Sequence, residues 1–152
     1  MNNDIFDELV KWKNIENGKR LPLVIQSHKY IGKTKSVKQF ADSQFRNYVY
    51  VNFKEHVYDS FYQIIPPQIL LELLSIFSVQ RITPGETLII FDNIQCMPSA
   101  LNSVVLFKDY APQYHICCIR NYLTNSPKPG NHSIQIIDRR GSKWMSSLKV
   151  NS

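Results

Sequence analysis

Residues 21–34 read LPLVIQSHKYIGKT and join a short apolar run to a glycine-lysine-threonine cluster. The run LPLVI (21–25) has the composition of a buried strand, and its proline stands near the start, where strands accept one. The residues KTKSVKQFA (33–41) place Val37, Phe40 and Ala41 at helical spacing. The stretch therefore predicts a strand, a turn over SHKYIG, and a helix.

The turn ends in the last three residues of the phosphate-binding pattern G-x-x-x-x-G-K-[ST]. In such a loop, backbone N–H groups cradle phosphates at a helix N-terminus, a lysine reaches the β- and γ-phosphates, and the Ser/Thr hydroxyl ligates Mg²⁺. The pattern's first glycine is Ser27 here, so we expect some backbone strain and a lower nucleotide affinity. The expected nucleotide-binding residues are Ser27, His28, Lys29, Tyr30, Ile31, Gly32, Lys33, Thr34 and Lys35. In a plainer interpretation, His28 and Lys29 face solvent and Tyr30 only covers the loop.

Further apolar runs follow, separated by helical patterns. Apolar strands without polar alternation, alternating with helices, indicate a parallel sheet covered on both sides. We therefore expect an α/β fold with a parallel sheet of about five strands and helices on both faces. The expected later strands are 48–53, 87–92, 114–119 and 133–138, and the other expected helices are 4–15, 66–77 and 98–110. In helix 66–77 we expect Leu70, Leu73, Leu74 and Phe77 to share one face.

The strand TLIIFD (87–92) stops at an acid, Asp92. The carboxyl ends of parallel strands meet at one edge of a sheet, which is where ligands bind. Because SHKYIGKT follows the first strand and Asp92 ends the third, we expect both at that edge. An acid in this position holds Mg²⁺ through water, so Thr34 and Asp92 are the predicted metal-side groups. The alternative is that Asp92 only caps the turn after its strand.

Several segments together resemble the AAA-type ATP-binding domain of a large bacterial and archaeal family of P-loop ATPases. They are the Trp12-Lys13 pair, KRLPLVI (19–25), GKT (32–34), FRNYVYVNF (45–53), TLIIFDNIQCMPSAL (87–101) and YHI (114–116). The resemblance covers about residues 5–119, and IIFD-x-IQ-x-x-P is its most specific part. It implies a P-loop NTPase-like fold, ATP and Mg²⁺ as ligands, Lys33 and Thr34 in the Walker A motif, and Asp92 in the Walker B motif.

Members of that family often carry a C-terminal nuclease-like domain of unknown function, and from Arg120 onward the resemblance fades. We expect residues 1–138 to form the ATP-binding domain, truncated relative to the family, and residues 139–152 to form a basic tail.

Besides Ser27, two residue pairs depart from what the resemblance implies. The family has Asp-Glu after the hydrophobic run, whereas this chain has Asp92-Asn93. An amide cannot accept the proton of the attacking water, and loss of a general base commonly lowers the rate by about 10²–10⁴. A small polar pair that senses the γ-phosphate in relatives is Arg120-Asn121 here. We expect Asn93 and Asn121 at catalytic positions, with Asn121 still able to hydrogen-bond phosphate or water, and we expect impaired hydrolysis.

Three functions follow from these residues. The first is an ATP-binding domain with slow or absent hydrolysis. The second is a degenerate interaction module that binds a protein partner and no nucleotide. The third is an active ATPase in which Asn93 orients water, as a glutamine does in some GTPases. Whether the chain is an enzyme is left open.

The net charge of +6 is concentrated at the end of the chain. Residues 139–152 hold four basic side chains and no acid. Nucleic-acid binding through this tail is a weaker hypothesis. No apolar run approaches the ~20 residues of a membrane helix. Residues 1–10 carry acids where a targeting leader would carry bases, so we expect a cytoplasmic protein with no membrane partner.

The three cysteines are Cys96, Cys117 and Cys118. An odd number without a C-x-x-C pair indicates reduced thiols, which we expect to be buried as small hydrophobic residues. The adjacent pair should leave opposite faces of its strand. A zinc site through His115 and Cys117 is a minor alternative, because the paired short spacings of such sites are missing.

Overall fold

The computed structural model describes residues 3–27, 33–55, 59–121, 135–138 and 143–145. Its strands are β1 (Leu23–Ser27), β2 (Asn47–Asn52), β3 (Thr87–Asp92), β4 (His115–Asn121), β5 (Gln135–Asp138) and β6 (Lys143–Met145). Its helices are α1 (Asn3–Lys13), α2 (Lys33–Gln44), α3 (Pro67–Ser78), α4 (Ala100–Val104) and α5 (Phe107–Tyr110), with 3₁₀ turns η1 (Asp59–Tyr62) and η2 (Ile94–Cys96).

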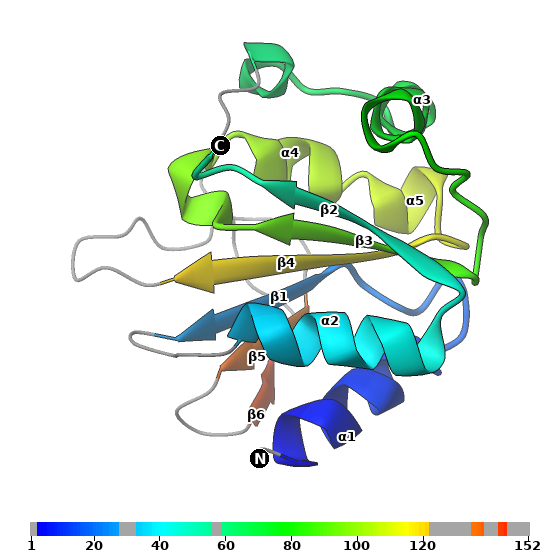
Figure 1. The fold of residues 1–152 in the computed structure, drawn as a ribbon, viewed down its shortest axis with the longest axis vertical. Helices are drawn as coiled ribbons and strands as arrows, with labels where there is room; N and C mark the ends of the chain where they lie inside the picture. Colours follow the sequence, from blue (N-terminus) through cyan, green and yellow to red (C-terminus); the bar gives the residue numbers. More distant parts are fainter. Residues whose placement is uncertain (1–2, 28–32, 56–58, 122–134, 139–142, 146–152) are drawn as a thin grey trace.

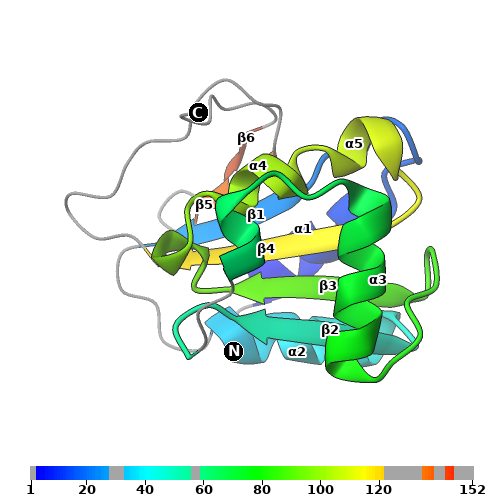
Figure 2. The same cartoon turned by 90° about the horizontal axis from the view of Figure 1, so that it is seen from above.

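Within these residues the chain forms one sheet with the strand order β2-β3-β4-β1-β5-β6 (Figure 1). Strands β1 to β5 run parallel to one another, and β6 pairs antiparallel with β5. Helices cover both faces of this sheet (Figures 1 and 2). The predicted α/β class, with a parallel sheet between helical layers, is confirmed.

Each face of the sheet has its own apolar core. Helices α1 and α2 pack on one face, where Trp12 and Phe40 are fully buried against β1, β3 and β4. Helices α3, α4 and α5 pack on the other face, around Phe91 and Phe107 (Figure 2). Neighbouring strand residues point to opposite faces, so each buried strand supplies both cores, which explains its continuous apolar sequence.

The adjacent cysteines follow this rule. Cys117 belongs to the core under α1 and α2, and Cys118 belongs to the core under α3, α4 and α5. Both are buried, as predicted. The prediction was wrong for Cys96, which is exposed at the end of η2, beyond the last residue of β3.

Three elements differ from their predictions. The helix expected over 98–110 is two short helices, because the Leu106 N–H bonds to the carbonyl of Ser103 and tightens the backbone between them. Helix α3 buries Leu70 and Leu74 but leaves Leu73 43% and Phe77 48% exposed. This helix packs at β2, the edge strand, so only a narrow stripe of it meets the core. Residues 143–145, expected within a basic tail, form β6.

None of the helices in the described ranges is long and apolar enough to cross a membrane.

Candidate functional site

The carboxyl ends of β1, β3 and β4 lie at one edge of the sheet, where their arrowheads point in Figure 1. The parallel register places Ser27 beside Asn121 and Asn52 beside Asp92. Helix α2 begins at this edge with Lys33. The fold therefore gathers the segments that the sequence analysis assigned to a single site.

Thr34 and Asp92 are in direct contact although 58 residues separate them. The Thr34 Oγ1 hydroxyl donates to Asp92 Oδ2 over 2.7 Å, and the carboxylate is buried. Its other oxygen, Oδ1, accepts the backbone N–H of Asn93 at 2.8 Å. The two predicted metal-side groups are thus in contact with each other, and several donors orient the Asp92 carboxylate.

Lys33 is buried at the first turn of α2, with 2% of its surface exposed. Its Nζ donates to the main-chain carbonyl of Arg120 at 3.1 Å, at the end of β4. A buried ammonium loses its hydration and needs acceptors in return, and this carbonyl is one of them. The bond keeps the lysine at the sheet edge, beside the Thr34–Asp92 pair.

These groups fit a magnesium nucleotide by their chemistry. An ammonium suits phosphate oxygens, while a hydroxyl and a carboxylate are oxygen ligands of the kind that Mg²⁺ prefers. All three stand where a helix begins, at the positive end of its dipole.

Asn93 follows Asp92 in a left-handed backbone conformation, with φ of 56°. Asparagine tolerates this region better than most residues. The side-chain Nδ2 donates to Asn52 Oδ1 at 2.9 Å, and Gln95 Nε2 donates to Asn93 Oδ1 at 3.2 Å. Asn52 in turn donates to Glu55 Oε1 at 3.1 Å. The predicted catalytic position is therefore occupied by an amide held in a polar network.

The remaining predicted residues are placed less completely. Ser27 and Asn121 end β1 and β4 as paired backbone positions. Lys35 is exposed on α2. The other predicted loop residues, His28, Lys29, Tyr30, Ile31 and Gly32, lie outside the described residues.

Two site residues were missed by the sequence analysis. The Tyr50 hydroxyl donates to Asp92 Oδ2, the same oxygen that accepts from Thr34. Burial and this hydrogen bond raise the pKa of Tyr50, so the phenol stays protonated and acts as a donor. Asn52 could have been found, because it ends a strand at the same edge. Tyr50 gave no signal, since a tyrosine within YVYVNF is an ordinary strand residue.

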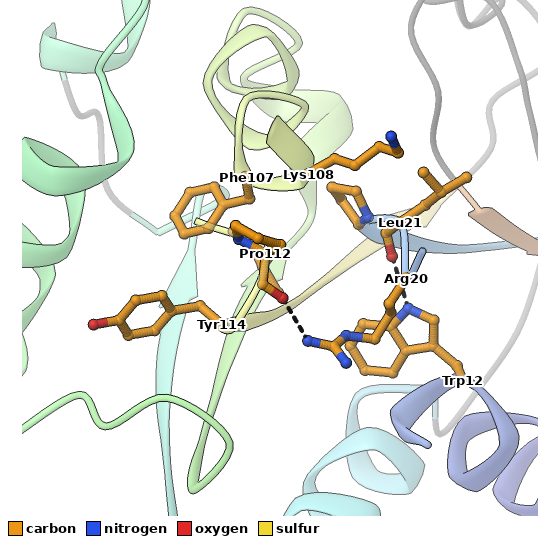
Figure 3. A pocket seen from close by; sticks show the side chains of 9 residues that line it. Trp12, Arg20, Leu21, Phe107, Lys108, Pro112 and Tyr114 are labelled. Atoms are coloured by element: carbon orange, nitrogen blue, oxygen red, sulfur yellow. Dashed lines mark hydrogen bonds between the residues drawn. The ribbon is translucent and has the colours of Figure 1, made fainter. Parts of the chain in front are cut away.

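A small hollow lies at the opposite edge of the sheet, before β1 and β4 begin (Figure 3). It has room for about one water molecule. The buried Arg20 donates to the carbonyl of Pro112 at 2.8 Å, and Trp12 Nε1 donates to the carbonyl of Leu21 at 2.8 Å (Figure 3). These bonds connect the segments that precede the two strands. We therefore interpret the hollow as part of the structural packing and not as a ligand site.

The zinc alternative finds no support in the described part of the chain. Among those residues, no group of three or more His, Cys, Asp and Glu side chains is placed to hold a metal ion.

The chain is similar to known proteins in its sequence and in its structure. A family model described as an AAA domain matches residues 19–126, more than half of the chain. The chain belongs to the AAA domain family. The match runs from just before β1 to beyond the end of β4, and so includes Lys33, Thr34 and Asp92. This AAA domain is a nucleotide-binding, ATPase-like domain.

The AAA domain is also similar to the solved structure of C. elegans PCH-2, at 11% sequence identity and a TM-score of 0.48. That similarity covers 81% of this chain and 37% of the PCH-2 chain. No curated protein matches the AAA domain by sequence.

Proposed function

We propose that this AAA domain binds ATP together with Mg²⁺ at the sheet edge formed by Lys33, Thr34 and Asp92, and hydrolyses it slowly or not at all. The observation that carries the proposal is the 2.7 Å bond between Thr34 and Asp92. It joins the start of α2 to the end of β3, beside a buried lysine. If Asp92 only capped the turn after β3, its contact with the Thr34 hydroxyl, 58 positions away in the sequence, would have no explanation.

Each of these side chains has a task in binding. Lys33 exchanges the Arg120 carbonyl for the β- and γ-phosphate oxygens and neutralises part of their charge. Thr34 and Asp92 would hold the cation, the hydroxyl oxygen as a ligand and the carboxylate as an acceptor for the cation's bound water. Bound Mg²⁺ supplies further charge neutralisation on the phosphates.

Asn93 supports the slow-hydrolysis part of the proposal. Its amide has no basic oxygen that can take a proton from water at neutral pH, and its side chain bonds to Asn52 and Gln95. Binding and hydrolysis are therefore separable in this AAA domain.

The test is a thermal melt with and without millimolar ATP and Mg²⁺. A ligand that binds only the native state raises its stability, by about 2.7 kcal/mol at a hundred times Kd. We expect the wild type to show this rise and Lys33→Ala to show none relative to its own ligand-free melt. Lys11→Ala, which removes an equal charge from an exposed position on α1, should keep the full rise.

A folded wild type whose melting temperature ignores Mg-ATP contradicts the proposal. That outcome supports the interaction module instead.

A further inference from the structure

We propose that Tyr50 is a positioning residue of this site, whose phenol orients the Asp92 carboxylate for Mg²⁺-dependent nucleotide binding. The inference rests on the proposed function and adds to it a residue from β2. Tyr50 lies outside the phosphate-binding motif, and its hydroxyl donates to Asp92.

The geometry at Asp92 is the starting point. Its Oδ2 accepts from the hydroxyls of both Thr34 and Tyr50, and its Oδ1 accepts the N–H of Asn93. The donors come from α2, from β2 and from the backbone after β3. The carboxylate plane is thus fixed from three directions.

Cation binding would change the balance among these donors. If Thr34 held Mg²⁺ through its oxygen, its O–H would have to turn away from the cation, and Oδ2 would depend more on its second donor. Tyr50 supplies that second side-chain donor, while the backbone N–H of Asn93 holds Oδ1. A carboxylate torsion is soft, so a carboxylate that loses a donor can rotate away from the cation's water shell. Outer-shell partners of this kind typically change metal affinity by about 10- to 100-fold.

Tyr50 is itself well fixed. Its backbone pairs with Ile90 in the ladder between β2 and β3. The Nζ of Lys38 lies 3.8 Å from the centre of its ring, and the half-buried ring packs against the core under α2. The position of the phenol oxygen is therefore set by the framework of the domain, as a positioning residue requires.

The experiment compares ATP affinity in Mg²⁺ and in EDTA by isothermal titration, using the full chain. In Tyr50→Phe we expect the affinity in EDTA to be unchanged and the affinity in Mg²⁺ to fall about tenfold or more. The ratio of the two affinities should therefore collapse toward one. A merely structural role would lower both affinities and leave the ratio intact.

Tyr48→Phe is the matched control. Tyr48 lies two residues earlier on the same face of β2 and pairs with Leu88, four positions before Asp92. Tyr48→Phe also removes a phenol oxygen, but the ratio of ATP affinities in Mg²⁺ and in EDTA should stay at the wild-type value. In an Asp92→Ala background, Tyr50→Phe should have no further effect on the ratio, because Tyr50 acts through Asp92.

The outcomes separate the two proposals. A wild type that binds Mg-ATP, with an unchanged ratio in Tyr50→Phe, overturns this inference and leaves the proposed function standing. A wild type that binds ATP in neither buffer overturns the proposed function itself. If Tyr50→Phe melts too low to titrate, Tyr50→Met carries the same expectation and the same contrary result.

Discussion

Asn93 combines a backbone conformation that suits it with a side chain that lacks a base. Its φ of 56° lies in the left-handed region, where most residues are strained by about 1–2 kcal/mol. The resemblance described above assigns a glutamate to this position. Asn93 therefore relieves local strain in this chain and at the same time removes the expected proton acceptor.

The substitution Asn93→Glu should lower the stability of the domain and raise its rate of ATP hydrolysis. We expect the unfolding free energy to fall by about 1 kcal/mol, because glutamate is less suited to this conformation. We expect ATP turnover to rise by about 10²–10⁴, because a carboxylate can accept the proton of water. Urea unfolding and phosphate release measure the two effects.

Asn93→Gln is the control for this prediction. Glutamine has the length of glutamate and meets the same backbone strain, but it carries no base. Equal turnover in the two variants would show that the missing carboxylate is not what limits hydrolysis.

At this scale the sequence predicted the motif residues and missed their neighbours. Lys33, Thr34 and Asp92 were predicted because motif spacing and strand ends are visible in a sequence. Tyr50 was not, because its contact with Asp92 depends on the register between β2 and β3, which no local pattern reveals.

Strand β4 begins with a buried histidine, His115, between the rings of Trp12 and Phe45. Its Nε2 donates to the carbonyl of Lys13 at 3.1 Å, whereas Nδ1 is buried and has no partner among the described residues. Burial, and then the nearby charge of Arg20, lower the pKa of His115 to about 4. The start of β4 therefore requires a neutral imidazole.

This histidine makes the stability of the domain depend on pH. In the unfolded chain a histidine takes up its proton near pH 6.5, whereas His115 in the fold does so only near pH 4. The contribution of neutral His115 to the unfolding free energy is complete above pH 6.5 and is lost as the pH falls toward 4. Between pH 7.5 and pH 5 the loss amounts to about 2 kcal/mol of unfolding free energy.

Urea unfolding at the two pH values checks this prediction against His115→Gln. The variant keeps a donor for the Lys13 carbonyl but does not titrate, so its stability should change less over the same interval by about that amount. An identical pH dependence in both proteins would mean that His115 is not the group responsible.

Elements with a uniform environment were predicted well. Strand β3 has the predicted bounds 87–92, because all six of its residues are buried. Helix α3 was predicted in place but not in orientation, since its position over the edge strand decides which side chains are covered. The break between α4 and α5 arises from one tightened turn, for which the run of apolar residues gave no sign.

On the scale of the whole molecule, the sheet separates two apolar cores. A thiol reagent can distinguish the cysteines buried in these cores from the cysteine on the surface. Cys96 is exposed, while Cys117 and Cys118 lie in opposite cores. Burial raises the pKa of both buried thiols and so suppresses the reactive thiolate.

Thiol labelling with a disulfide reagent should therefore be biphasic. We expect Cys96 to react at once in the native protein, and Cys117 and Cys118 to react only as the sheet unfolds. In urea all three should react together, and absorbance of the released thiolate follows each phase. Fast native labelling of Cys117 or Cys118 would show that β4 is not a protected central strand.

The layered arrangement was largely predictable from alternating apolar strands and helices, since that pattern leaves few ways to bury both faces. The position of β6 was not, because the segment 143–145 is too short to indicate a strand. Its pairing with β5 is a property of the assembled sheet.

The main-chain carbonyl of Arg120 holds the ammonium of Lys33 by a hydrogen bond. This carbonyl belongs to β4, which lies between β3 and β1 in the sheet. Because the sheet holds this carbonyl in place, the Lys33 ammonium is the group that must move when it binds a phosphate. Releasing it sacrifices a charge-assisted bond of about 1.5–3 kcal/mol. A small anion with a single charge offers little more than this carbonyl already provides, whereas a polyphosphate offers several oxygens at once. We therefore expect the proposed site to favour highly charged anions before any base or sugar is recognised.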